Sequence, residues 1–169
     1  FKQSGTAAIR INFAMEKNLT IFFLTSRHTQ HKIVLDTMRI LKDKYNKPIP
    51  VSSIIGKKWM CAMEGASTMH TSDFVPYCKH LRENQQCEYF INAKSKTDPK
   101  PKMVINDLSA RSPIIIEEVI EDCKKEKLCP YEISLDLVSK ARVIIADYFY
   151  IFNSKIREGF LNKTKKELD

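Results

Sequence analysis

The stretch NLTIFFLTSRHTQHKIVLDTMRIL, residues 18–41, decides which class of fold the sequence favours. Its first part, LTIFFLT, is a short apolar run rich in residues that favour strands. Its second part places apolar residues at helical spacing between Ile33 and Leu41, and Thr29 is a suitable N-cap for that helix. The segment NKPIP at 46–50 ends the helical pattern. A strand followed by an amphipathic helix is therefore predicted here.

A helical pattern also precedes the strand, in TAAIRINFAMEKN at 6–18. The order helix, strand, helix is the repeating unit of a parallel sheet covered by helices. Near the other end of the chain, SLDLVSKA at 134–141 predicts a helix capped by Ser134, and RVIIADYFYIF at 142–152 predicts a β-branched and aromatic strand. We therefore expect an α/β fold whose parallel sheet is built from both ends of the sequence.

The middle of the chain differs from both ends. It carries the cysteines, has no strong strand pattern, and contains the breaker-rich tract AKSKTDPKPK at 93–102, which is typical of a flexible, solvated loop. Its one clear helix is SPIIIEEVIEDCKKEK at 112–127, where Ser-Pro precedes acidic and then basic residues, the order that the helix dipole favours. The middle is thus predicted to be a mainly helical, loop-rich insertion between two pieces of one sheet.

Composition limits both the size of the core and the class of partner. A chain of 169 residues with 43% hydrophobic content can form one domain with an insertion. The formal net charge of +8 and a pI near 9.2 favour a polyanionic partner, with nucleic acid ahead of a membrane surface. No apolar run approaches the roughly 18 residues of a membrane span, and the first residues lack the layout of a signal peptide. We expect a soluble, intracellular protein.

The sequence has five cysteines, an odd number that rules out a complete set of disulfides. None of the gaps matches the close C-x2-4-C pairs of ordinary zinc sites. An iron–sulfur cube tolerates wide and irregular spacing, because its four thiolates need only converge in space. A free cysteine is also a common small buried side chain, so either role remains open for each of them at this point.

Three segments around the cysteines resemble the XPD family of iron–sulfur helicases. They are GKKWMC at 56–61, VPYCKHLRENQQCEYF at 75–90 and LCPYEISLDLVSKARVIIADYFYIFN at 128–153. The third is the most specific, because in that family a Cys-Pro-Tyr leads through a helix into a strand that precedes the Walker B box. Residues 18–41 are similar to the strand and helix around helicase motif Ia of the same family. The resemblance spans about residues 6–155.

This resemblance implies a [4Fe–4S] cluster held in a C-x16-C-x8-C-x41-C pattern, with Cys123 as a spare residue on the apolar face of its helix. The implied ligands are Cys61, Cys78, Cys87 and Cys129. It also implies sequence-independent contacts with single-stranded DNA and with junctions of single and double strands. The residues expected to make these contacts are Arg27, Thr29, Gln30, Lys57, Lys58, Trp59 and Tyr148.

The sequence departs from the family pattern at three positions in these segments. Ser26 stands where motif Ia usually has an arginine, and Arg27 takes the place of the threonine that follows. Lys57 replaces the arginine found four residues before the first cluster cysteine. A lysine keeps the charge but lacks the planar fork that binds a phosphate through two hydrogen bonds, so a weaker clamp is expected.

The resemblance implies a whole protein that is an ATP-dependent DNA helicase of the nucleotide excision repair type, moving 5′ to 3′ with the cluster region as a wedge. It implies motor domain 1 at 1–55, the cluster domain at 56–130 and a return to motor domain 1 at 131–169. No G-x-x-x-x-G-K-[ST] sequence and no Asp-Glu-Ala-His box is present, so ATP and Mg²⁺ are expected only in a longer parent, and this chain alone is expected to be inactive.

We further expect a monomer from an archaeal or other prokaryotic cytoplasm, or from a nucleus if the parent is eukaryotic. The alternative is a stand-alone metal-binding module for nucleic acid, without a motor, which holds zinc or an iron–sulfur cluster through some of the same thiols. An enzyme with a cysteine nucleophile is a more distant third reading, because no Cys–His–Asn order is recognisable.

Overall fold

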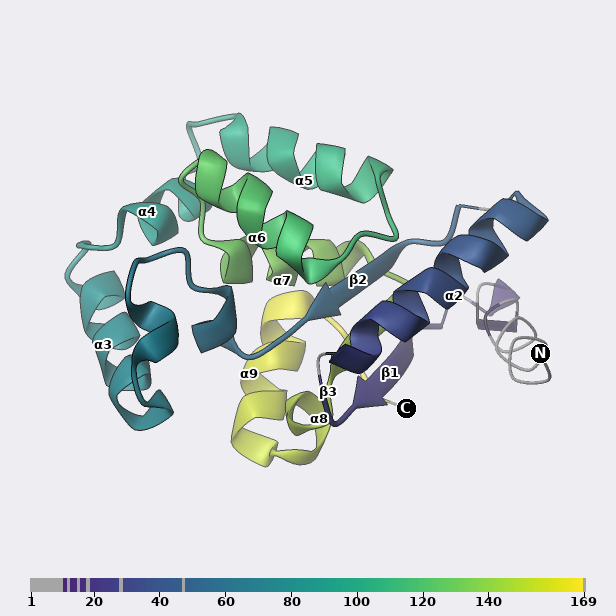
Figure 1. The fold of residues 1–169 in the computed structure, drawn as a ribbon, viewed down its shortest axis with the longest axis horizontal. Helices are drawn as coiled ribbons and strands as arrows, with labels where there is room; N and C mark the ends of the chain where they lie inside the picture. Colours follow the sequence, from purple (N-terminus) through teal and green to yellow (C-terminus); the bar gives the residue numbers. More distant parts are fainter. Residues whose placement is uncertain are drawn as a thin grey trace.

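The computed structural model describes residues 11, 13–14, 16–17, 19–27, 29–46 and 48–168. At its centre lies a parallel sheet in the order β1-β3-β2, with β1 at Ile21–Thr25, β2 at Val51–Ile54 and β3 at Val143–Asp147 (Figure 1). The middle strand β3 is buried from Val143 to Ala146, as expected for a continuous apolar run covered on both faces. The predicted α/β class with a parallel sheet is confirmed.

Helix α2, Thr29–Tyr45, covers one face of the sheet (Figure 1). Its buried side chains recur at helical spacing and pack with alternate residues of β2 and β3. This layer comprises Ile11, Val34, Leu35, Met38, Leu41, Ile49, Val51, Val143 and Ile145. The strand and helix predicted within residues 18–41 are therefore confirmed, whereas the helix predicted over 6–18 lies mostly outside the described residues.

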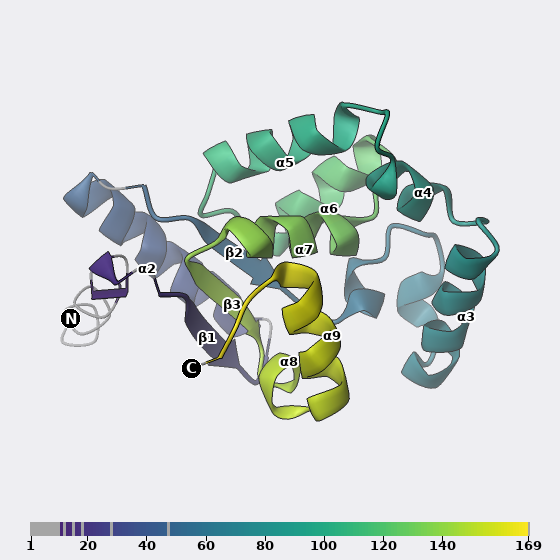
Figure 2. The same cartoon turned by 180° about the vertical axis from the view of Figure 1, so that it is seen from behind.

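The opposite face is covered by α7, Pro130–Lys140, and by α9, Ser154–Thr164 (Figure 2). Helix α7 begins with Pro130 in its first turn, where the missing N–H of proline costs no hydrogen bond. The prediction that Ser134 caps this helix was wrong, because Ser134 lies inside α7 and is fully buried. Proline starts the helix one turn earlier than the serine pattern indicated.

The strand predicted over 142–152 ends at Asp147, and the short helix α8, Phe149–Phe152, follows it. The aromatic composition favoured a strand, but burial of the Tyr150 ring overrides that preference. The ring packs 4.7 Å from Phe160 of α9, and its hydroxyl donates a 2.8 Å hydrogen bond to the carbonyl of Ile55. A continued strand would have carried Tyr150 past both partners.

Between β2 and α7 the chain forms a series of short helices. They are η1 at Lys57–Met60, η2 at Ala66–Thr68, α3 at Thr71–Glu83, α4 at Glu88–Lys94, α5 at Lys100–Ala110 and α6 at Ile116–Lys125. The helix predicted at 112–127 is confirmed as α6, but it begins at Ile116, after the Ser112–Pro113 pair that was expected to start it. The loop predicted over 93–102 was wrong at both ends, because α4 extends to Lys94 and α5 begins at Lys100. Pro101 lies in the first turn of α5, where proline is compatible with a helix.

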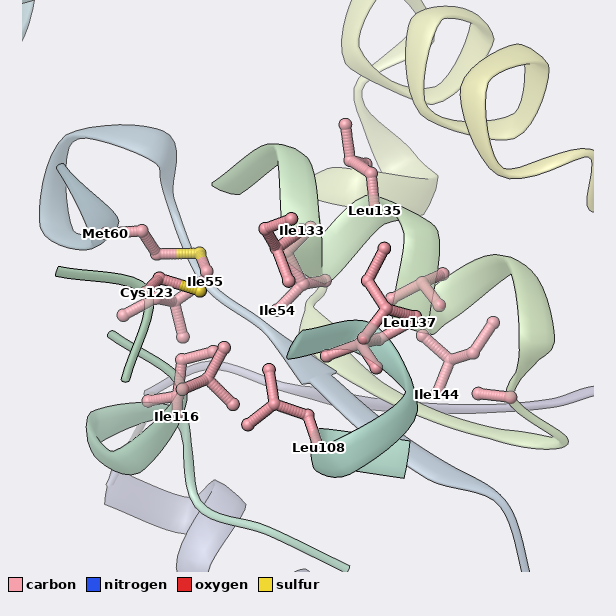
Figure 3. Packing of buried hydrophobic residues seen from close by; sticks show 14 of the residues in the cluster. Ile54, Ile55, Met60, Leu108, Ile116, Cys123, Ile133, Leu135, Leu137 and Ile144 are labelled. Atoms are coloured by element: carbon pink, nitrogen blue, oxygen red, sulfur yellow. The ribbon is translucent and has the colours of Figure 1, made fainter. Parts of the chain in front are cut away.

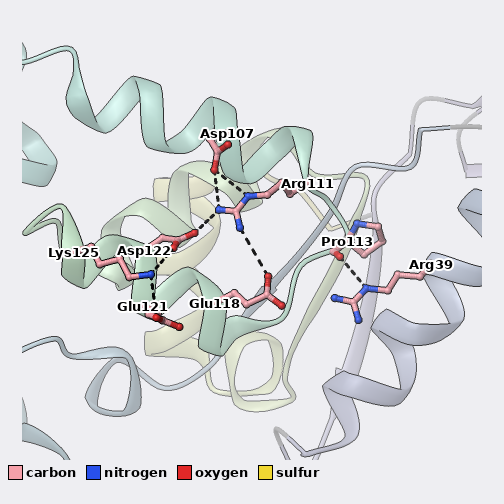
Figure 4. A network of polar contacts seen from close by, with 8 residues as sticks. All are labelled: Arg39, Asp107, Arg111, Pro113, Glu118, Glu121, Asp122 and Lys125. Atoms are coloured by element: carbon pink, nitrogen blue, oxygen red, sulfur yellow. Dashed lines mark hydrogen bonds and ion pairs between the residues drawn. The ribbon is translucent and has the colours of Figure 1, made fainter.

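Helices α5 and α6 pack onto α7 and share its hydrophobic core with β2 and β3 (Figure 3). Beyond α5, Arg111 contacts Asp107 of α5 and both Glu118 and Asp122 of α6 (Figure 4). The hydroxyl of Ser112 then bonds the backbone N–H and carbonyl of Val51, each at 2.9 Å, which ties this link to the edge of β2. The middle of the chain is thus anchored to the sheet through α5, α6 and α7. Within the described ranges, no helix has the length and apolarity needed to cross a bilayer.

Candidate metal centre and nucleic-acid interface

Four cysteines from four separate segments line one cavity. Cys61 directly follows η1, Cys78 lies within α3, and Cys87 and Cys129 are the residues that precede α4 and α7. A 2.9 Å hydrogen bond from the backbone N–H of Cys129 to the carbonyl of Tyr89 joins the starts of α4 and α7. Elements far apart in the sequence therefore bring these four thiols, the predicted cluster ligands, to one place.

The cavity makes isolated thiolates unfavourable. Burial raises the pKa of the Cys61 thiol, and the neighbouring Cys78 and Cys87 raise it further by repulsion between thiolates. Burial also raises the pKa of Cys129 to about 11, although the backbone N–H groups of Glu132 and Tyr131 and the charge of Lys57 act in the opposite direction. Without a metal, deprotonation of these thiols is opposed by burial and by repulsion between thiolates. A cationic metal group would remove both obstacles, because it replaces the thiol protons.

The donor set fits an iron–sulfur cube in number and kind, because four cysteine sulfurs surround one cavity. Within the part of the chain that the structure describes, no three side chains of His, Cys, Asp or Glu lie close enough to hold a single metal ion. A cube binds each of its four thiolates to a different iron atom, so it does not require three donors on one ion. The assignment of the four ligands stays a prediction.

Cys123 has a different environment. Its side chain is fully buried in α6, beside Met60, Ile55 and Ile116 of the hydrophobic core (Figure 3). Burial raises the pKa of this thiol to about 12. Cys123 does not line the cavity of the other four cysteines, and it packs as a small apolar side chain.

A buried carboxylate with two partly exposed lysine partners lies beside the cavity. Glu132 is only 2% exposed, and its carboxylate lies 3.8 Å from Lys57 Nζ and 3.0 Å from Lys94 Nζ. Lys57 Nζ also lies 5.0 Å from the centroid of the Tyr131 ring. Lys57 therefore lines the cavity and has Glu132 as an internal partner, and the DNA contact that the family resemblance implies for it stays a prediction.

A second hollow, about 330 Å³ in volume, lies at the carboxyl ends of the strands, where α/β sheets commonly bind ligands. We call it the strand-end groove. Its lining residues are Ser26, Arg27, Thr29, Ile55, Trp59, Asp147 and Phe149. Three of the residues predicted to contact DNA, Arg27, Thr29 and Trp59, are thus brought together, although they come from two distant segments.

The other predicted DNA contacts lie next to the strand-end groove. Lys58 Nζ is 4.1 Å from the Trp59 ring centroid, and the exposed Gln30 donates its backbone N–H to the carbonyl of Arg27. The ring of Tyr148 lies 4.3 Å from that of Phe149. Phe149 also lines the groove but was not predicted as a site residue, because the predicted strand continued through it. A strand that ended at Asp147 would have placed Phe149 at the carboxyl edge of the sheet.

The DEAD_2 family model matches residues 23–168, which include all four cavity cysteines and the whole strand-end groove. The chain belongs to the DEAD_2 family. This DEAD_2 chain is 26% identical over 86 residues to regulator of telomere elongation helicase 1 of Mus musculus, covering 50% of the chain and 6% of that protein. It is 27% identical over 81 residues to the general transcription and DNA repair factor IIH helicase subunit XPD/RAD3 of Saccharomyces cerevisiae, covering 48% of the chain and 10% of that protein. These matches span only a small part of each relative.

Proposed function

We propose that this DEAD_2 chain is the cluster-bearing portion of an ATP-dependent DNA helicase that moves 5′ to 3′ and acts in nucleotide excision repair. One observation carries the proposal: four cysteines from separate segments line one cavity, while the fifth is buried in the core. Membership of the family and the similarity to two helicases support it. In this proposal residues 1–55 and 131–169 belong to the motor domain, and 56–130 form the cluster domain.

Cys61, Cys78, Cys87 and Cys129 would hold a [4Fe–4S] cluster, which supplies iron–thiolate bonds that cross-link η1, α3, α4 and α7. The chain's own groups prepare this site. The backbone N–H groups at the start of α7 and the charge of Lys57 favour the thiolate of Cys129, whereas burial and the charge of Glu132 raise its pKa. Glu132 Oε1 lies 3.8 Å from Lys57 Nζ. Helices α3 and α4 would then form a stiff wedge at the fork between single and double strands.

DNA would bind through its phosphates and through base stacking, without regard to sequence. Arg27, Thr29, Gln30, Lys58, Trp59 and Tyr148 are the proposed contacts at the strand-end groove. Lys57 contributes to this surface only when it leaves Glu132. ATP and Mg²⁺ would bind elsewhere in the parent protein, since phosphoryl transfer requires phosphate and magnesium ligands that this sequence lacks.

Anaerobic purification tests the cluster assignment. The protein should be brown and should contain about four iron and four sulfide ions per chain. Cys129→Ser should abolish the colour, whereas Cys123→Ala, the matched control, should keep it, because Cys123 lies outside the cavity. Colourless protein with stoichiometric zinc contradicts the cluster proposal, and so does loss of colour in the control together with its retention in Cys129→Ser.

The motor is tested with a longer protein extended on both sides of this chain. A helicase parent must supply a G-x-x-x-x-G-K-[ST] sequence before this region and an acidic box after it. The extended protein should unwind a duplex with a 5′ single-stranded overhang in the presence of ATP and Mg²⁺, and a duplex with only a 3′ overhang should remain intact. Equal unwinding of both substrates contradicts the proposed polarity.

A further inference from the structure

Exposed aromatic and aliphatic side chains gather where α8 meets α9. Phe149 is 53% exposed, Phe152 is 74% exposed, and Ile156 on the first turns of α9 is 43% exposed. Phe149 and Phe152 are three residues apart on the same helical face. Trp59, which lines the strand-end groove together with Phe149, is 57% exposed. We call Trp59, Tyr148, Phe149 and Phe152 the aromatic platform. Exposed apolar side chains that gather in this way mark an interaction surface.

The charges around the aromatic platform are mostly positive. Arg27 lines the groove with Trp59 and Phe149, and Lys58 lies over the Trp59 ring. Lys155 and Arg157 flank Ile156 on α9. The groove also contains the carboxylate of Asp147, and α9 carries Glu158. Asp147 Oδ1 lies 3.8 Å from Nε2 of the buried His31.

Flat aromatic rings next to cations fit an unpaired nucleobase better than they fit another protein. Each base of a single strand offers a π face, and the phosphates between the bases attract arginine and lysine. A duplex hides these faces within its own stack, so a ring at the surface cannot reach them. The rings of Tyr148 and Phe149 lie in contact, with centroids 4.3 Å apart and planes tilted by 30°, so two aromatic faces meet at this position.

We propose that Phe149 and Phe152 form a base-stacking subsite for single-stranded DNA, which continues the path from Trp59 and the strand-end groove along α8. This inference rests on the proposed function in taking single-stranded DNA as the ligand. It adds two binding residues to that function, and it states that they distinguish single strands from duplex. Figures 1 and 2 show α8 directly after the carboxyl end of β3, at the edge of the sheet where the strand-end groove lies.

The chain carries its own probe for this subsite. Trp59 is the single tryptophan of the sequence, so its fluorescence reports on the strand-end groove alone. Addition of a single-stranded oligo(dT) should quench this emission. Phe149→Ala and Phe152→Ala should each lower the affinity for oligo(dT) by about five- to a hundredfold, the loss expected when one stacking partner is removed. Binding to a blunt duplex should be unchanged in both variants.

Four further variants separate base stacking from electrostatic attraction and from non-specific apolar contact. Met103→Ala removes a 66% exposed apolar side chain on α5, away from the groove, and should bind oligo(dT) like the wild type. Arg27→Ala should reduce the salt dependence of binding by about one phosphate contact, whereas Phe149→Ala should leave that dependence unchanged. Phe149→Leu should bind as weakly as Phe149→Ala, and Phe149→Trp should bind at least as tightly as the wild type.

The binding results distinguish failure of the proposed function from failure of the stacking subsite. If the wild type fails to bind oligo(dT), the DNA part of the proposed function fails and this inference fails with it. If the wild type binds and both alanine variants match Met103→Ala, this inference is wrong while the proposed function stands. Two results would overturn the stacking subsite: wild-type affinity of Phe149→Leu for oligo(dT), or a loss of affinity for the blunt duplex equal to the loss for oligo(dT). Either would identify the aromatic platform as a general apolar contact, such as one for a protein partner.

Discussion

Helices α7 and α3 have similar lengths but are held in place in different ways. Seven of the eleven residues of α7 are buried, including Ile133, Leu137 and Val138, and the helix packs against both the sheet and α6. Only Phe74 is buried among the thirteen residues of α3, and only Ala93 in α4. Short helices without an apolar face against a core are marginal in water. Apolar packing therefore fixes α7, whereas α3 and α4 bury few side chains of their own and would gain support from the proposed cluster.

The largest expected effect follows from removing the proposed cluster. When a chelator strips the iron, amide hydrogen exchange in α3 and α4 should approach the rate of an unstructured peptide, because the cross-link is lost and little apolar burial remains. The amides of α7 and β3 should keep their protection. Hydrogen exchange measured before and after chelation checks this contrast. Equal loss of protection in α3 and β3 would show that the two regions unfold as one unit.

Core substitutions should divide the molecule in the same way. Ile144→Ala, at a fully buried position of β3, should lower the free energy of unfolding of the whole chain by about 2–5 kcal/mol. Phe74→Ala removes the one buried apolar anchor of α3 and should leave the main urea midpoint nearly unchanged, while exchange in α3 rises. Urea unfolding followed by circular dichroism gives the first quantity. A similar shift of the midpoint in both variants contradicts the division.

The buried thiol of Cys123 should make the core sensitive to alkaline pH. Its pKa is raised from 9.0 to about 12 in the folded state, so above pH 9 the unfolded chain loses a proton that the folded chain keeps. The contribution of this thiol to the free energy of unfolding is therefore fully present below pH 9 and is lost as the pH rises from 9 to about 12. Cys123→Ala should therefore lose less stability than the wild type when the pH rises from 8 to 10.5. Urea midpoints at the two pH values measure this difference, and equal losses would contradict it.

Sequence patterns predicted the elements whose burial is one-sided and regular. The strand at 21–25 and the helix from Thr29 followed directly from apolar spacing, and α6 followed from its acidic-to-basic order. The strand β2 was missed because its sequence is VSSI, and two serines conceal a segment that is buried at all four positions. Ser52 and Ser53 are small enough to fit beneath the covering helices. This fit depends on tertiary packing, so the apolar pattern of the sequence does not indicate it.

The site was predictable in part for the same reason. The four cysteines could be selected through the segments that resemble a family, and the structure brings them to one cavity. Spacing alone could not show that Lys57 turns toward Glu132, because that contact joins the start of η1 to a buried carboxylate 75 positions later. It also could not show that Tyr148 and Phe149 leave the strand, since the turn depends on where the Tyr150 hydroxyl finds its partner.

The smallest expected effect concerns the ion pairs of Arg111 at the junction of α5 and α6. Surface charge should add little to the stability of a region that already shares the hydrophobic core. Arg111 donates to Asp107 at 2.9 Å and lies 3.9 Å from Glu118, but its side chain is 41% exposed (Figure 4). Exposed ion pairs contribute about 0–1 kcal/mol, and salt screens them. Arg111→Ala should therefore lower the free energy of unfolding by less than about 1 kcal/mol at low salt, and by less again at high salt. A loss equal to that of Ile144→Ala, and independent of salt, would mean that the Arg111 network and not the apolar core holds α5 and α6 together.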